Sequence, residues 1–101
     1  TEATLAQNAE AAGRQAAAQN ARASEDAAYA EYEDVLAQCT NPAFFDKSQM
    51  GGSYTSRDIT VNRNLEMCNS ALSSARDLAY RRKDQDRIRR YANFKFGVPG
   101  Q

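Results

Sequence analysis

The fold of this chain is decided by residues 39–68, CTNPAFFDKSQMGGSYTSRDITVNRNLEMC, which begin and end on the two cysteines. Pro42 disfavours helical backbone at the residue before it. The Gly51-Gly52 pair allows a turn of either hand. Residues 40–56 are therefore predicted to form a loop, and helix-forming sequence lies on both sides of it. We expect two helices to meet at this loop, each with a cysteine on its apolar stripe.

Upstream of the loop, residues 3–38 are predicted to form one long helix, because Ala, Gln, Glu and Arg favour helix and the segment has no Pro. A stripe of mostly small residues follows helical spacing: Leu5, Ala9, Ala12, Ala16 and Ala23. A bulkier stripe continues it: Ala28, Tyr32, Val35, Leu36 and Cys39. The alternative for the first half is low-complexity sequence with partial helicity.

Downstream of the loop, residues 57–96 are predicted to form a second helix, followed by a tail over residues 97–101. The apolar positions repeat at heptad spacing: Val61, Leu65, Cys68, Leu72, Ala75 and Ala79. Gly97 and Pro99 are typical of the end of a helix. Sustained period-two alternation is missing from the sequence, so strands are not expected.

The two cysteines have two interpretations. They are either buried thiols that act as small hydrophobic residues, or a disulfide across an antiparallel helix pair. If Cys39 faces Cys68, facing positions sum to 107 and large residues meet small ones. The pairs are then Val35 with Leu72, Tyr32 with Ala75, Ala28 with Ala79, Glu25 with Arg82 and Asp26 with Arg81. This agreement of apolar and charge patterns favours the disulfide.

These patterns predict a single all-α domain of 101 residues. It is a long antiparallel two-helix hairpin, coiled-coil-like, held by one disulfide. Alanine dominates the apolar residues, so the core buries little area for a chain of this size. We therefore expect partner helices to complete the structure.

The formal net charge is zero, from 13 basic and 13 acidic residues, but the charges are separated along the chain. Residues 24–34 carry five acids and no base, while residues 76–95 carry eight bases and three acids. Arg87, Arg89 and Arg90 fall opposite polar or small residues in the assumed register. They are therefore expected to be free for an acidic partner, whereas Arg81 and Arg82 are expected to pair with the acidic stretch within the hairpin.

No set of residues in the sequence points to catalysis, and we expect a protein that is not an enzyme and needs no cofactor or metal. Histidine is absent, and so are phosphate-binding glycine motifs. The acids Glu31, Glu33 and Asp34 suggest a solvated face more than a metal cluster. No apolar run approaches the length of a membrane span.

Apolar and basic residues outside the two seams are the candidates for partner binding. They are Phe44, Phe45, Tyr54, Arg87, Arg89, Arg90, Phe94 and Phe96. The sequence favours a structural or assembly subunit that packs with other protein subunits, as a homo-oligomer or in a larger complex. The alternative is a binding module whose basic second helix contacts nucleic acid or an anionic membrane surface.

A disulfide would place the protein in an oxidising compartment: periplasm, extracellular space, organelle lumen or virion. The first residue is Thr rather than Met, so we expect a processed or trimmed N-terminus.

Overall fold

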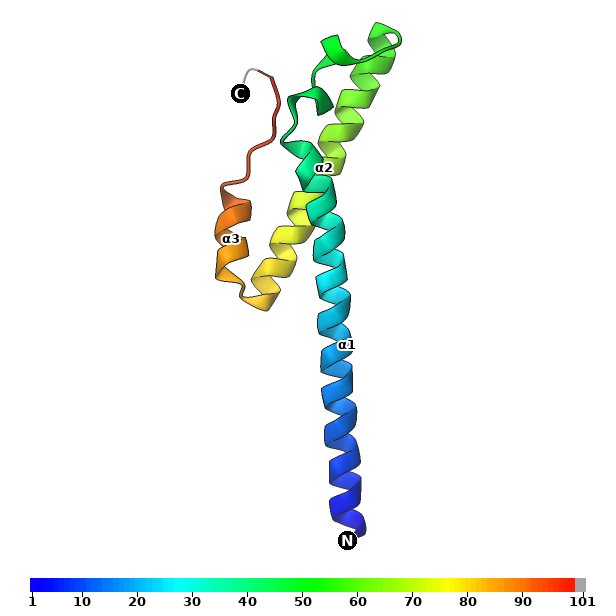
Figure 1. The fold of residues 1–101 in the computed structure, drawn as a ribbon, viewed down its shortest axis with the longest axis vertical. Helices are drawn as coiled ribbons and strands as arrows, with labels where there is room; N and C mark the ends of the chain where they lie inside the picture. Colours follow the sequence, from blue (N-terminus) through cyan, green and yellow to red (C-terminus); the bar gives the residue numbers. More distant parts are fainter. Residues whose placement is uncertain (100–101) are drawn as a thin grey trace.

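The computed structural model describes residues 1–99; the last two positions of the predicted tail, 100 and 101, lie outside the described residues. In this part of the chain, the helices are α1 (Glu2–Cys39), α2 (Tyr54–Arg82) and α3 (Gln85–Ala92), with short 3-10 turns η1 (Pro42–Phe44) and η2 (Lys47–Gln49) in the loop. The molecule is elongated, 74 × 27 × 14 Å (Figure 1). The predicted all-α hairpin is confirmed.

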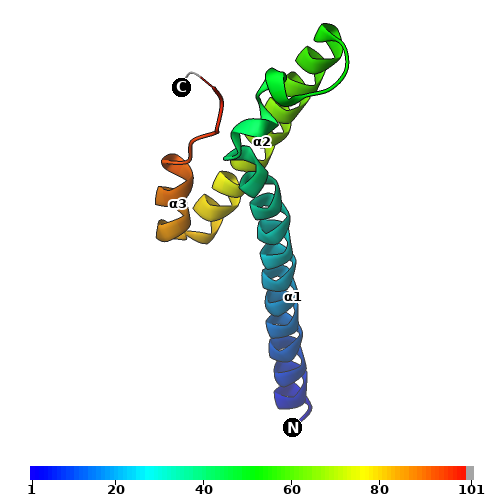
Figure 2. The ribbon, with the colours of Figure 1, turned by 45° about the horizontal axis from the view of Figure 1, so that its top comes forward.

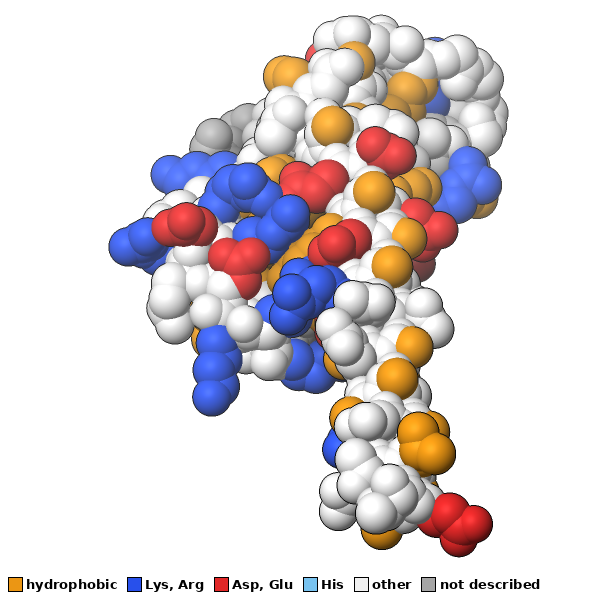
Figure 3. Space-filling model, turned by 60° about the horizontal axis from the view of Figure 1, so that its bottom comes forward, with side chains coloured by type: hydrophobic (Ala, Val, Ile, Leu, Met, Phe, Trp, Pro, Cys, Tyr) orange, Lys and Arg blue, Asp and Glu red, His pale blue; other side chains and the backbone are white. Residues whose placement is uncertain are grey.

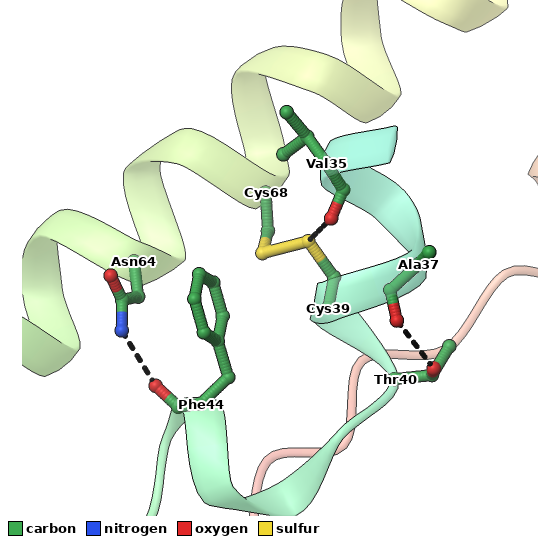
Figure 4. The surroundings of a disulfide bond; sticks show 7 residues. All are labelled: Val35, Ala37, Cys39, Thr40, Phe44, Asn64 and Cys68. Carbon is green, nitrogen blue, oxygen red and sulfur yellow. Dashed lines mark hydrogen bonds between the residues drawn. A yellow bond between two sulfur atoms is a disulfide. The ribbon is translucent and has the colours of Figure 1, made fainter. Parts of the chain in front are cut away.

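Helices α1 and α2 run antiparallel and cross where the disulfide joins them (Figure 4). Cys39 and Cys68 are both fully buried, and their Cα atoms are 5.9 Å apart. The Cys39 sulfur also lies 3.1 Å from the Val35 carbonyl oxygen. Since a bridged sulfur carries no hydrogen, this is a close contact and not a donated hydrogen bond. The disulfide therefore closes the hairpin at its apolar centre.

The predicted register is correct to within one residue at the far end of the pair. Arg82 Nη1 donates a hydrogen bond to Asp26 Oδ1 over 2.7 Å, where Asp26 was expected to face Arg81. The carboxylate holds the pKa of Arg82 above its usual value, mainly through this hydrogen bond. The acidic part of α1 thus lies beside the basic end of α2, as the charge pattern indicated.

The predicted second helix, 57–96, is wrong in one respect: it is two helices with a sharp reversal between them. Lys83 adopts left-handed backbone at φ 55°. The Lys83 N–H donates a hydrogen bond to the Tyr80 carbonyl, and the Asp84 N–H donates to the Ala79 carbonyl. Together these two bonds form a Schellman motif. The Asp84 side chain then caps α3 by accepting from the Arg87 N–H. Two polar residues therefore end one helix and begin the next.

Helix α3 lies beside the end of α2, and the chain after it returns towards the loop (Figure 2). Gly97 donates its backbone N–H to the Cys39 carbonyl over 2.8 Å. A Cβ atom at this position would lie 2.5 Å from the Thr40 carbonyl oxygen. Gly97 is therefore needed for close backbone contact with the end of α1, and not for the left-handed helix cap that the sequence suggested.

The core lies where α1, α2 and α3 meet. Its buried residues are Tyr29, Leu36, Cys39, Phe45, Cys68, Ala71, Ala75, Leu78, Ala79 and Tyr91. Tyr29 and Ala71 were not on the apolar stripes that the sequence predicted, whereas Leu78 and Tyr91 continue the apolar face of the second helix. Because α3 folds back, it covers a second face of the hairpin and buries side chains that a two-helix pair would leave open.

Side chains also order the loop. Asn64 Nδ2 donates to the Phe44 carbonyl over 2.8 Å and ties the loop to α2 (Figure 4). Asp46 caps η2, and hydrogen bonds from Ser48 and Gln49 hold the pKa of its carboxyl below the usual value. Ser53 caps α2, slightly earlier than residue 57. The loop is thus a fixed part of the hairpin end.

Candidate functional site

The most prominent surface is the first part of α1, residues 2–24, which we call the arm. Every residue from 1 to 24 is exposed, whereas residues 25–39 include the buried positions that pack on the rest of the chain. Figure 1 shows the arm projecting well beyond α2 and α3. At 1.5 Å per residue, the arm is about 34 Å of helix without tertiary packing inside the described chain.

The arm carries the small-residue stripe that the sequence predicted. Leu5 is 68% exposed although it is a large apolar side chain, and Ala9, Ala12, Ala16 and Ala23 are exposed on the same stripe. Space is open around Gly13 as well. Figure 3 shows orange apolar side chains along the arm and few charged ones. Such a surface lets another helix pack with about 8 Å between the two helix axes.

The base of the arm is held by a cluster of charged and aromatic side chains centred on Glu33. Glu33 Oε1 accepts from Arg87 Nη1 over 3.1 Å and from the Tyr91 hydroxyl over 2.5 Å, and it also accepts from Arg90. The Arg87 guanidinium lies 3.8 Å from the centre of the Tyr29 ring, at cation–π distance. One carboxylate of α1 thus binds three side chains of α3.

Burial controls the ionisation of the two tyrosines in this cluster. It raises the pKa of Tyr91, and the hydrogen bond to Glu33 raises it further, so the hydroxyl remains a donor. Burial also raises the pKa of Tyr29, against the opposing effect of Arg87. The Tyr29 hydroxyl is buried without a hydrogen-bond partner among residues 1–99. The cluster therefore favours neutral tyrosines beside paired charges.

The three candidate arginines are not free, and the expectation that they lack partners in the chain is wrong. Arg87 and Arg90 bind Glu33, and Arg89 Nη2 donates to Asp86 over 2.6 Å. The reason is the reversal at the end of α2, which turns α3 back so that it meets α1. Binding of these arginines to an outside partner stays a prediction.

The phenylalanine candidates gather at the loop end of the hairpin. Phe44 packs edge-on against Phe45 at 5.4 Å between ring centres, and Phe96 lies 6.2 Å from Phe45. Phe94 and Phe96 are 5.9 Å apart. Phe45 is only 3% exposed, so it belongs to the core and is not open to a partner. The other three are half-buried, and partner contact through them stays a prediction.

Tyr54 is the most exposed of the candidates, at 74%. It begins α2, and the Lys47 ammonium lies 5.6 Å from its ring centre. Lys47 also forms an ion pair with Asp58, which raises the pKa of the lysine. The loop thus presents one open aromatic ring beside an internally paired charge.

Among residues 1–99, no group of three or more His, Cys, Asp or Glu side chains is placed to hold a metal ion. None of the helices in this part of the chain has an apolar stretch of the length and hydropathy that crossing a membrane requires. That the protein is not an enzyme stays a prediction.

The contact of Glu33 with α3 and the burial of Tyr29 were not predicted from the sequence. A signal was present: Tyr29 and Glu33 are four residues apart, as are Arg87 and Tyr91, so each pair shares a helix face. This spacing would have predicted a contact between the two pairs only if the chain were already known to reverse between Arg82 and Arg87.

Comparison with known proteins adds no relative, since no family model, curated protein or solved structure matches the chain.

Proposed function

We propose that this protein is a non-enzymatic structural subunit whose arm packs against helices of other protein subunits in a larger assembly. The observation that carries the proposal is the exposure of the whole arm, residues 2–24. The stability of an isolated helix in water is marginal and depends on its length. In proteins, most of the stability of a helix comes from tertiary packing. A helix of this kind gains its packing when another helix covers it.

The rest of the chain supports this role as a rigid base. The disulfide fixes α1 to α2, and the Glu33 cluster fixes α1 to α3. Two residues beyond the end of the arm, Asp26 also accepts a hydrogen bond from Arg82 of α2. Since these contacts hold α1 against both α2 and α3, the direction of the arm is set by the hairpin. A subunit built in this way presents its contact helix at a constant angle.

The disulfide also supports a location in an oxidising compartment, such as periplasm, extracellular space, an organelle lumen or a virion. Both sulfurs are fully buried, so reductants reach them poorly while the hairpin is folded. The proposed assembly is therefore one that forms outside a reducing environment.

The proposal is tested with two matched pairs of substitutions on the arm. Ala9→Glu/Ala16→Glu places two charges on the small-residue stripe, and Ala11→Glu/Ala18→Glu places them at the same spacing away from it. Light scattering after size exclusion measures the mass of each variant. We expect the first variant to lose assembly and the second to retain it. A monomeric wild-type chain at all concentrations, without affinity for other subunits, would contradict the proposal.

The alternative, a binding module for nucleic acid or an anionic membrane, has weaker support. The three arginines, Arg87, Arg89 and Arg90, form ion pairs with three acids, Glu33, Asp84 and Asp86. This leaves less free positive charge on α3 than the sequence suggested. Counterion release makes such binding fall steeply with salt. Binding to DNA or anionic vesicles that falls with salt, and that Arg87→Glu/Arg89→Glu/Arg90→Glu abolishes, would favour this alternative.

A further inference from the structure

The arm has a charge pattern with a direction. Its charged residues are Glu2 and Glu10 in the first half and Arg14 and Arg22 in the second half. All four are exposed, and Glu10 and Arg14 lie one helical turn apart, 3.9 Å between Oε2 and Nη1. The arm is therefore negative towards its beginning and positive towards its base, with the change of sign near residue 12.

This pattern makes the arm complementary to itself in one orientation. If two arms lie antiparallel, the acidic half of each lies beside the basic half of the other. If they lie parallel and in register, acid meets acid and base meets base. The helix dipoles act in the same sense, because antiparallel helices set the positive end of one beside the negative end of the other. Both effects favour the antiparallel pair.

The shape of the molecule favours the same orientation. The molecule is up to 27 Å across, and its width comes from α2 and α3 at the base of the arm (Figure 1). A parallel pair sets both wide parts at the same level, while the arms approach to about 8 Å. An antiparallel pair places the wide parts at opposite ends of about 34 Å of paired helix.

We propose that the arm binds the arm of a second copy of this chain, antiparallel, with a two-fold axis near residue 12. The inference rests on the proposed function, since it names the partner that covers the arm. The contact is isologous, so the same surface serves both copies and the assembly closes as a dimer. The exposed stripe of Leu5, Ala9, Ala12, Ala16 and Ala23 provides the close approach.

Spin labels on single introduced cysteines test the orientation in the full-length, disulfide-bonded chain. Ala3→Cys and Ala21→Cys lie on one face of the helix and away from the stripe, at 3.6 residues per turn. In the antiparallel pair, Ala3 of one copy is level with Ala21 of the other. Two labels at position 3 are then separated by about 27 Å along the axis.

Pulsed electron paramagnetic resonance measures the distance between the two spin labels in each sample, and the expected result is a ranking of these distances. A mixture of the two labelled chains gives a shorter distance than either chain labelled alone. A shorter distance for each chain alone shows a parallel pair, which overturns the inference and leaves the proposed function standing. An oligomer in which arm labels are far apart in every sample also overturns it. A chain that is monomeric throughout overturns both the inference and the proposed function.

Salt provides an independent readout. Attraction between opposite halves is screened, so we expect the dimer dissociation constant to rise between about 20 mM and about 200 mM salt. The rise should be small, because Glu10 and Arg14 lie on the face of the arm away from the stripe. A parallel pair would tighten over the same range, because repulsion between like halves is screened. A constant or falling dissociation constant therefore contradicts the antiparallel pairing.

Discussion

At the scale of single residues, Glu33 connects helix α1 to helix α3. Its carboxylate accepts from Arg87, Arg90 and the Tyr91 hydroxyl, and Tyr91 is only 1% exposed. The Tyr91 hydroxyl can donate this hydrogen bond only while it keeps its proton. Contacts of this kind give the fold a dependence on alkaline pH.

We predict that stability falls at high pH because of Tyr91. Its folded pKa is raised above the ordinary value of 10.0. The unfolded chain therefore loses the phenol proton first, and the stabilisation is complete below that value and lost as the pH rises through the folded pKa. The free energy of unfolding in urea, measured between about pH 9 and about pH 11, should decline.

Tyr91→Phe is the control for this pH effect. It removes the titrating hydroxyl and is expected to cost about 1 kcal/mol near neutral pH, where a hydrogen bond to Glu33 is lost. The variant should also show a shallower alkaline decline, with the remainder due to Tyr29, whose pKa is raised too. An equally steep decline in wild type and variant would show that Tyr91 is not responsible.

A second prediction concerns the close contact at Gly97. In Gly97→Ala, the added Cβ would lie 2.5 Å from the Thr40 carbonyl oxygen, so the backbone must shift. We expect a loss of about 1–3 kcal/mol, as for other overpacked positions. Gly51→Ala is the matched control, since no atom lies within 4 Å of its Cβ. Similar melting temperatures for the two variants, followed by circular dichroism, would refute the contact.

At the scale of helices, the reversal at Lys83 and Asp84 determines which residues meet. It brings α3 back along α2 so that Arg87 and Tyr91 reach Glu33 on α1. Lys83 carries a left-handed backbone conformation that costs most L residues about 1–2 kcal/mol. Lys83 is therefore not a favourable residue at this turn, which the Asp84 cap and the contacts of α3 maintain.

Lys83→Gly is predicted to stabilise the protein by about 0.5–1 kcal/mol, because glycine adopts this conformation without steric cost. Lys83→Ala removes the same charge and is expected to give no such gain. Urea unfolding of the two variants separates the backbone effect from the charge effect. Equal stability of Lys83→Gly and Lys83→Ala would contradict a left-handed Lys83.

The disulfide is predicted to contribute strongly to the hairpin. It joins residues 29 positions apart, and the chain-entropy estimate for a loop of this size is about 3.5 kcal/mol. Cys39→Ala/Cys68→Ala should therefore unfold at a much lower urea concentration than the oxidised wild type. Reduction of the wild type provides a second comparison without a change of volume. Unchanged unfolding after confirmed reduction would show that helix packing alone holds the hairpin.

At the scale of the whole molecule, sequence patterns predicted the hairpin and the disulfide, but not that residues 1–24 would all be exposed. They could do so because Cys39, Cys68 and the apolar stripes are local signals with helical period. The reversal at Lys83 was not predictable, because lysine gives no sign of a left-handed turn and Asp84 resembles any surface acid. The roles of Glu33 and Tyr91 followed from that reversal, so they were also missed.

The central claim is that the arm is ordered by association with another copy. Hydrogen exchange of the arm amides tests it most directly, because a helix without packing opens readily while a covered helix is protected. We predict protection over residues 5–24 at concentrations where the dimer forms and its loss on dilution to the monomer, with residues 29–39 protected in both. Arm protection that does not change with concentration would contradict the account.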